Sequence, residues 1–261
     1  MSDDNIDRQL RLASPTIYEI IATEGEEELS RPIPSLAWSG LIAGLCISFS
    51  LFCEGYLRHH LPGDGDYFLI ENFGYTFGFV IVIIARLQLF TENTITVVLP
   101  LLEKRTKRNF IRTGKLWAAV LCTNFVGTFI AAFLVVKLNI VSPELLAVFT
   151  DISKHAVMHD FWHTFKLGIP AGFLIACLVW MLPSAHGGSQ FFVIVMMTYI
   201  IAIGDFSHIV AGSAEAFLLL IQGDIGLYET VRFLVAACAG NIIGGTCLFA
   251  LLAYNQVRFE R

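Results

Sequence analysis

The sequence predicts an all-α membrane protein with six membrane-spanning helices. Of its 261 residues, 56% are hydrophobic and only 15% are charged, and the mean hydropathy is +0.68. The charged residues cluster in short runs between long apolar windows, which is not the pattern of a soluble domain. A net charge of −5 gives no support to nucleic-acid binding. We therefore expect membrane lipid to surround most of the chain.

Six apolar windows approach or exceed the roughly 20 residues that a membrane-spanning helix needs: 36–57, 73–101, 116–137, 165–182, 190–220 and 229–254. The second and fifth are longer than one span requires. Each contains a polar interruption, Gln88 to Asn93 in the second and Gly204 to His208 in the fifth. Backbone groups in hydrocarbon must be hydrogen-bonded within the protein, so a polar break at this depth indicates two half-helices beside an enclosed cavity. The sequence thus predicts that helices 2 and 5 are broken.

These windows divide the chain into a cytoplasmic N-terminal segment (1–34), a six-span transporter or channel domain (35–257) and a cytoplasmic C-terminal end (258–261). In the first segment, Ser14 as N-cap and Pro15 at the first helical position predict an amphipathic helix against the membrane face. Two prolines, at 32 and 34, end it. A cleaved signal peptide is not expected, because the first segment has no short apolar stretch followed by a small-residue cleavage site.

Orientation follows from the basic residues of the loop between the second and third spans, which are Lys104, Arg105, Lys107, Arg108, Arg112 and Lys115. Lysine and arginine in short loops mark the cytoplasmic side of a membrane. Counting spans away from this loop puts both termini in the cytoplasm and the 58–72 loop outside. We expect a multi-pass protein of the bacterial inner membrane.

The two halves of the chain resemble each other over about 35–137 and 163–254. The first span carries Gly40, Ala43 and Gly44, and the fourth carries Gly168, Ala171 and Gly172 at the same spacing. Thr91 in the first break precedes Asn124 by 33 residues, and His208 in the second precedes Asn241 by 33. Small residues at such spacing are also common in any membrane helix bundle. Three spans per half would give the halves opposite topology, and inverted repeats place the substrate site at their interface, where we expect Thr91 and His208 to meet.

With these motifs the chain resembles the formate/nitrite transporter family over nearly its whole length. The motifs are Leu89-Phe90-Thr91 in the second span, Phe206-Ser207-His208 in the fifth, and Gly240-Asn241-Ile242-Ile243-Gly244-Gly245 in the sixth. The resemblance implies an aquaporin-like protomer with broken second and fifth helices, assembled as a homopentamer with one pore per protomer. It also implies a small monovalent anion as substrate, such as formate or nitrite.

By motif matching, Thr91 is the threonine that hydrogen-bonds the pore histidine, His208. The resemblance places aromatic and aliphatic gates on either side of that pair, for which the candidates are Tyr75, Phe79, Phe90, Ile175 and Phe206. Asn124 and Asn241 complete the set of candidate pore residues.

Several positions depart from the family pattern close to this site. The small residues and acid that usually precede Leu-Phe-Thr are replaced by Arg86-Leu87-Gln88, and Gly-Phe-Glu before the histidine is replaced by Asp205-Phe206-Ser207. An asparagine usual in the fourth span corresponds to Gly172, and Lys154 is the nearest replacement for a lysine of the outer vestibule. The inference of the fold still holds with these departures, whereas the inference of the substrate does not.

Ionisable residues inside spans are costly and usually functional. A histidine in a low-dielectric pore favours its neutral form, yet transient protonation would let it pass a proton to a weak-acid anion. Alternatively, histidine polarity and the half-helix N-termini lower the barrier for an anion without any transfer. The other candidate intramembrane charges are Arg86, Glu92 and Asp205. Arg86 is expected to pair with Asp205 or Glu92 and brace the break; alternatively, it is an anion-attracting charge in the vestibule. Glu54 is expected to extend to water from an outer helix end.

His155, His159 and His163 form a stripe at i, i+4 and i+8 before the fourth span. This spacing can bind metal, but without an acidic partner we interpret the stripe as a solvated, partly cationic vestibule face that attracts anions. Six cysteines occur without CxxC or Cys/His ligand spacing. No metal, cofactor or nucleic-acid partner is expected.

The leading functional hypothesis is a channel or proton-coupled transporter for small monovalent anions or their weak acids. An alternative is a pore of the same fold for a neutral or cationic small solute, motivated by Asp205 and Glu92 and by the missing vestibule lysine. A membrane enzyme or sensor is a third possibility. The sequence disfavours it because no nucleophile and base pair is apparent and no large soluble domain is present.

Overall fold

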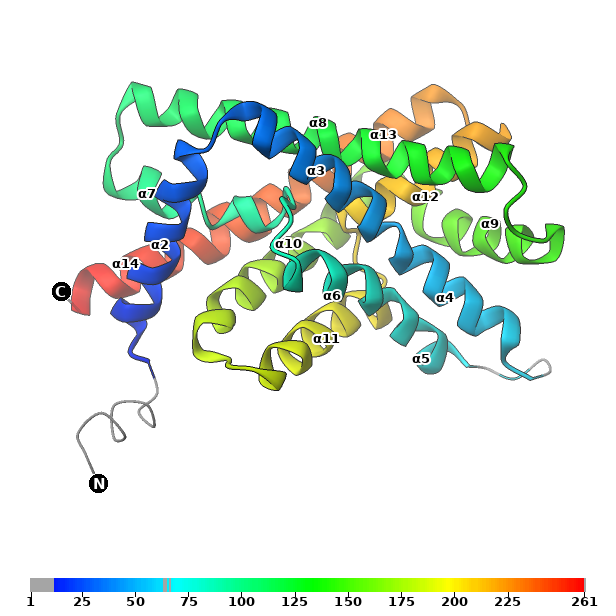
Figure 1. Cartoon of the computed structure of the whole chain (residues 1–261), viewed down its shortest axis with the longest axis horizontal. Helices are drawn as coiled ribbons and strands as arrows, with labels where there is room; N and C mark the ends of the chain where they lie inside the picture. Colours follow the sequence, from blue (N-terminus) through cyan, green and yellow to red (C-terminus); the bar gives the residue numbers. More distant parts are fainter. Residues whose placement is uncertain (1–11, 63–64, 66, 261) are drawn as a thin grey trace.

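The computed structural model describes residues 12–62, 65 and 67–260, and in that part of the chain every regular element is helical (Figure 1). The first half contains α2 (Ser14–Ser30), α3 (Ile33–Ile47), α4 (Phe49–His60), α5 (Phe68–Glu71), η1 (Asn72–Tyr75), α6 (Thr76–Ile84), η2 (Glu92–Thr94), α7 (Val98–Glu103) and α8 (Lys107–Lys137). The second half contains α9 (Pro143–Val157), α10 (Phe161–Met181), η3 (Leu182–Ser184), α11 (Gly188–Ile203), α12 (Ile209–Gln222), α13 (Leu227–Ile242), η4 (Ile243–Ala250) and α14 (Leu251–Glu260).

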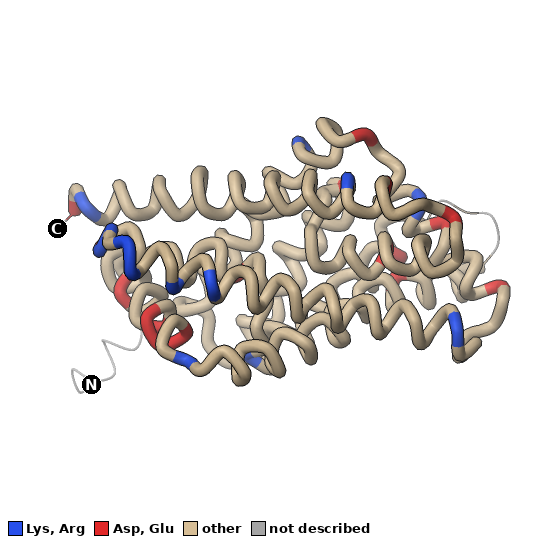
Figure 2. Tube along the Cα trace, turned by 90° about the horizontal axis from the view of Figure 1, so that it is seen from above, with Lys and Arg blue, Asp and Glu red and all other residues tan. Residues whose placement is uncertain are grey.

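Within residues 12–62, 65 and 67–260, four continuous apolar helices are long enough to cross a membrane. They cover Ile33–His60, Lys107–Lys137, Phe161–Ser184 and Leu227–Glu260. The charged residues gather toward the two ends of the molecule, and its middle is largely uncharged (Figure 2). This distribution is the one that a bilayer imposes, because hydrocarbon solvates no charge.

The second and fifth apolar windows contain shorter helices with irregular backbone between them. In the second, α6 ends at Ile84 and α7 begins at Val98, and in the fifth, α11 ends at Ile203 and α12 begins at Ile209. Each irregular stretch contains one non-glycine residue in the left-handed region, Arg86 (φ 53°) and Asp205 (φ 51°). A positive φ is uncommon for a residue with a side chain, and at these two positions it ends the helical conformation after α6 and α11.

Equivalent close helix approaches occur in the two halves. α3 packs on α8 and α10 packs on α13, in each case through glycines. A Cβ added to Gly44 would overlap the backbone oxygen of Asn124, and one added to Gly172 would overlap that of Asn241. Only a residue without a side chain fits at either contact, because the two helix backbones touch there.

The N-terminal helix α2 packs against protein rather than lying alone at the surface. It contacts α7 and α14 and lies at the same end of the molecule as they do (Figure 1). The Tyr18 hydroxyl donates to the Leu99 carbonyl at 3.3 Å. The expected N-cap is wrong, since Ala13 holds that position and Ser14 is already helical, its Oγ accepting from Gln256 at 3.1 Å. The helix ends at Ser30, before the two prolines, as predicted.

Candidate functional site

The two irregular stretches meet at a hydrogen bond between Thr91 and His208. Thr91 Oγ1 lies 2.8 Å from His208 Nε2, and both residues are buried. They are 117 positions apart in the sequence. The contact predicted from the repeat is therefore present.

The helix that follows the second stretch determines which proton His208 carries. His208 is the N-cap of α12, and its Nδ1 accepts the Ala211 backbone N–H at 3.2 Å. An amide N–H only donates, so Nδ1 must be the unprotonated nitrogen of a neutral ring. The proton then lies on Nε2, which donates to Thr91 Oγ1.

Asn124 holds the first irregular stretch in place from α8. Its Nδ2 donates to the carbonyls of Gly40 and Gln88, both at 2.8 Å, and its Oδ1 accepts from the backbone N–H of Phe90 at 3.0 Å. These bonds satisfy backbone groups that the interrupted helix leaves without partners.

Asn241, on α13, holds the second irregular stretch in place in the same way. Its Nδ2 donates to Gly168 and Ser207 at 2.9 and 2.8 Å, and its Oδ1 accepts from Ile209 at 2.9 Å. Both asparagines are fully buried and line neither cavity described below. The hydrogen bonds of these two side chains brace the backbone behind the site, and their assignment as pore residues stays a prediction.

The predicted gating side chains occupy different places around His208. The ring of Phe79 packs edge-on against the imidazole with centroids 4.9 Å apart, and Tyr75 lies 5.3 Å from Phe79. Phe90 is buried against Trp117 at 5.7 Å. Ile175 is buried in the core, and Phe206 lines a cavity together with His208.

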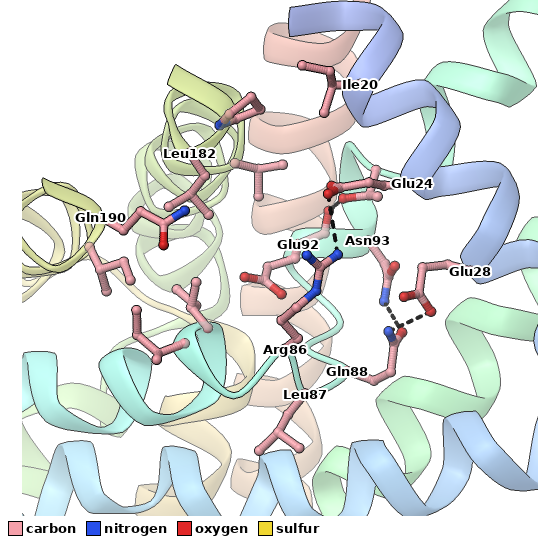
Figure 3. Close-up of a pocket in the computed structure, with 16 residues that line it drawn as sticks. Ile20, Glu24, Glu28, Arg86, Leu87, Gln88, Glu92, Asn93, Leu182 and Gln190 are labelled. Carbon is pink, nitrogen blue, oxygen red and sulfur yellow. Dashed lines mark hydrogen bonds and ion pairs between the residues drawn. The ribbon is translucent and has the colours of Figure 1, made fainter. Parts of the chain in front are cut away.

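A cavity of about 290 Å³ lies beside the first irregular stretch and under α2; we name it the α2-side cavity (Figure 3). Glu24 and Glu28 of α2 point toward the stretch, where Glu24 pairs with Arg86 at 3.3 Å and Glu28 accepts from Gln88 at 2.8 Å. The expected pairing of Arg86 with Asp205 or Glu92 is wrong. Glu92 lines this cavity without forming that ion pair, and Asp205 lines a different one.

A second, smaller cavity of about 60 Å³ reaches His208 from the opposite end; we name it the α9-side cavity. His155 and Asp205 lie in its lining, with His155 Nε2 3.2 Å from Asp205 Oδ1, and both side chains are largely exposed. Two buried carboxyl groups, Glu54 and Glu215, also line it. The expectation that Glu54 extends to water is wrong, because only 8% of the residue is exposed.

The histidine stripe lies only partly in the α9-side cavity. His155 and His159 line it, whereas His163 does not, although the rings of His159 and His163 are 4.4 Å apart. Burial and then the neighbouring His163 and His155 lower the pKa of His159 below its usual value. Within the described residues, no group of three or more His, Cys, Asp or Glu side chains is arranged to hold a metal.

Comparison with known proteins identifies this arrangement. The sequence profile of the formate/nitrite transporter family matches residues 15–255. The chain belongs to this family. It is 42% identical to the inner membrane protein YfdC of Escherichia coli over 93% of this chain and 78% of that protein. It is also 26% identical to the formate channel FocA of Haemophilus influenzae over 90% of this chain and 93% of that one.

Solved structures share the fold of this formate/nitrite transporter family member. A pentameric formate channel with formate bound superposes with a TM-score of 0.74 at 20% identity, covering 88% of this chain and 98% of that chain. An FNT family ion channel superposes with a TM-score of 0.78 at 17% identity, covering 92% and 98%. At these identities the likeness concerns the fold alone.

The structure also shows where the replacement for the family's vestibule lysine lies. Lys154 pairs with Asp224 at 3.3 Å and is absent from the lining of the α9-side cavity. This member therefore combines the family fold with a cavity whose lining is acidic and histidine-rich. The acids Glu24 and Glu28 of the other cavity were missed in the sequence because they belong to a polar segment remote from both breaks.

Proposed function

We propose that this protein is a membrane channel or proton-coupled transporter for small monovalent anions or their weak acids, with formate and nitrite as the first candidates. The observation that carries the proposal is the hydrogen-bonded pair of Thr91 and His208 between the two cavities. A small anion at the imidazole would meet a polar N–H in surroundings that otherwise exclude water. Family membership and the formate channel among the relatives support the same conclusion.

The proposed pore runs from one cavity to the other past this pair. Phe79, Tyr75, Phe206 and Phe90 would close it to water, while Arg86 and Asp205 would set the electrostatic field at its two mouths. The buried position of Phe79 against the imidazole supports a gating role. Ile175 would contribute bulk behind these rings.

We propose that the chain crosses the membrane six times, with broken second and fifth helices and inverted repeats over about 35–137 and 163–254. The matching bonds of Asn124 and Asn241 support this arrangement. We also propose the division into 1–34, 35–257 and 258–261, a location in the bacterial inner membrane, and cytoplasmic termini. The packing of α2 against α14 supports placement of both on one side. A homopentamer is proposed because the formate channel of the same fold is pentameric.

A pore of the same fold for a neutral or cationic solute is the second candidate. It is favoured by Glu54, Glu215 and Asp205 in the α9-side cavity, whose lining contains no lysine or arginine among the described residues. An ionised carboxylate there would repel anions and attract cations. The two candidates are distinguished by the species that crosses a bilayer. No enzymatic activity is proposed, in keeping with the channels and transporters among the relatives.

Uptake into proteoliposomes containing the purified protein tests the proposal. Formate, nitrite, hydrosulfide, lactate and glycerol are compared, with His208→Ala beside the unmodified chain. Uptake of an anion that is lost in the variant supports an anion pore centred on His208. Movement of glycerol or a cation with none of the anions would retain the fold and reject the proposed substrate class.

A further inference from the structure

We propose that the proton accompanying an anion through this protein is carried by the buried carboxyl groups of Glu54 and Glu215, and that His208 acts as a neutral hydrogen-bond donor. This inference rests on the proposed function and names the groups that would couple it to protons. Both ring nitrogens of His208 are already occupied by hydrogen bonds.

Protonating His208 would require a proton on Nδ1. That nitrogen accepts the Ala211 N–H at 3.2 Å, so a second proton would place two N–H donors face to face and break the cap of α12. The ring is also covered by Phe79. The geometry therefore favours a histidine that offers its Nε2 proton as a hydrogen bond without becoming an imidazolium.

Glu54 on α4 and Glu215 on α12 are better placed to exchange a proton. They are 8% and 5% exposed and line the same small cavity as His208. Within the described residues, neither carboxyl group makes a hydrogen bond or ion pair. Glu215 follows His208 by two helical turns, about 10 Å along α12 on the same face. An anion in this cavity therefore lies in a space that both carboxyl groups share with His208.

In the described part of the chain no cation forms an ion pair with either carboxyl group, and Arg58, whose charge acts on Glu54, is already paired elsewhere. Arg58 pairs with Asp151 at 2.7 Å and lies 3.9 Å from Glu71, and Lys154 pairs with Asp224 at 3.3 Å. The other titratable groups lining the cavity are Tyr75, His155, His159, Asp205 and His208. Two unpaired carboxylates in one buried cavity are costly through desolvation and mutual repulsion, so the pair retains at least one proton.

The proposed transfer moves one proton from the carboxyl pair to the anion. A carboxylic acid of the pair gives its proton to the anion, the neutral weak acid forms, and a carboxylate remains. The neutral acid passes His208, where it replaces Thr91 Oγ1 as the acceptor of the Nε2 hydrogen bond, and releases the proton in the α2-side cavity. A proton from the aqueous phase then reaches the carboxylate through the mouth of the α9-side cavity, where the side chains of His155 and Asp205 are 64% and 46% exposed. Anions of strong acids cannot take this route.

The test compares the intact protein with Glu54→Gln, Glu215→Gln and the double variant in proteoliposomes, using formate as the permeant. We expect formate uptake to rise as the outside pH falls between about 8 and 5 in the unmodified protein. The double variant should lose this rise and transport formate at least on the order of tenfold more slowly at the acid end. Infrared spectroscopy should show a protonated-carboxyl band at neutral pH that is absent from the double variant.

Controls separate loss of the proton from loss of the fold. Glu144→Gln removes an exposed carboxyl group of α9 outside the cavity and should change nothing. Glu215→Asp retains a carboxyl group, so formate uptake by this variant should still rise as the pH falls. This variant also tests the inference if a glutamine variant does not fold. Retention of acid-stimulated formate uptake by a folded double variant would overturn the inference while leaving the proposed function intact. If the unmodified protein moves no anion, the proposed function itself fails, and the inference fails with it.

Discussion

Asn124 and Asn241 hold the two irregular stretches with the same set of three hydrogen bonds. Each amide donates to a glycine carbonyl on a neighbouring helix and to one carbonyl of the stretch, and accepts the backbone N–H two residues further on. The two halves of the protein thus solve the same problem, backbone without helical partners in the bundle interior, in the same way.

Replacing Asn241 by alanine should unfold the second stretch locally and destabilise the protein. Three buried backbone groups lose their partner, at an expected cost of more than about 2 kcal/mol in the free energy of unfolding. Thermal unfolding in detergent measures the effect. Asn255→Ala on α14, whose side chain makes no hydrogen bond within the described residues, is the control and should be nearly neutral. Equal stability of the two variants would contradict the bracing role.

Thr91→Val should impair transport while Thr91→Ser should not. Valine has nearly the shape of threonine but offers no oxygen to His208 Nε2, which then loses a partner held at 2.8 Å. We expect a reduction in formate uptake on the order of tenfold, the effect of losing about 1.4 kcal/mol of stabilisation. Proteoliposome uptake at one pH measures it. A valine variant as active as the serine variant would show that the hydrogen bond is dispensable.

Gly44→Ala and Gly172→Ala should both be destabilising, because the added methyl group overlaps the backbone oxygen of Asn124 or Asn241. Inserting an extra methyl group into such a tightly packed contact typically costs about 1–3 kcal/mol. Gly114→Ala on α8, whose Cβ would meet no atom within 4 Å, is the matched control and should be neutral or slightly stabilising. The midpoints of thermal unfolding of the three purified variants test this prediction. If Gly44→Ala and Gly172→Ala both unfold at the same temperature as the unmodified protein, the close approach of the helices is contradicted.

The contact of α2 with the first irregular stretch should govern how firmly this helix is held. Glu28→Ala removes the acceptor for Gln88, and Glu24→Ala removes the partner of Arg86. Because the Arg86 pair is partly exposed, its loss should cost no more than about 1 kcal/mol. Hydrogen exchange of the α2 amides should become faster in the double variant. Glu27→Ala, an exposed neighbour on the same helix, should leave exchange unchanged.

Acid should destabilise the protein partly through His159. Burial and the adjacent histidines lower its pKa in the folded state, so the unfolded chain binds this proton more readily. The resulting loss of stability begins as the pH falls through the ordinary histidine pKa of about 6.5 and is complete below the lowered folded value. His159→Asn should therefore show a smaller fall in unfolding temperature across this range. An unchanged pH profile would exclude His159 as the source.

Local sequence predicted some parts of the site and misplaced others. The Thr91 and His208 contact followed from the repeated 33-residue offset, and the positions of the irregular stretches followed from their polar residues. The partner of Arg86 did not, because Glu24 lies on a helix whose docking no periodicity specifies. The burial of Glu54 was missed because α4 is covered there by α9, a helix outside the predicted spans.

The sequence by itself determined the class of this protein, the apolar segments, the two interruptions and the family. These properties depend on composition and on spacings along the chain. Burying charge or unpaired backbone in hydrocarbon is costly, so membrane-spanning segments must follow patterns that can be recognised in the sequence. Only the tertiary structure decided what the asparagines bind, which nitrogen of His208 carries its proton, and which carboxyl groups face the α9-side cavity. These properties depend on contacts between residues that are distant in sequence, and packing alone brings such residues together.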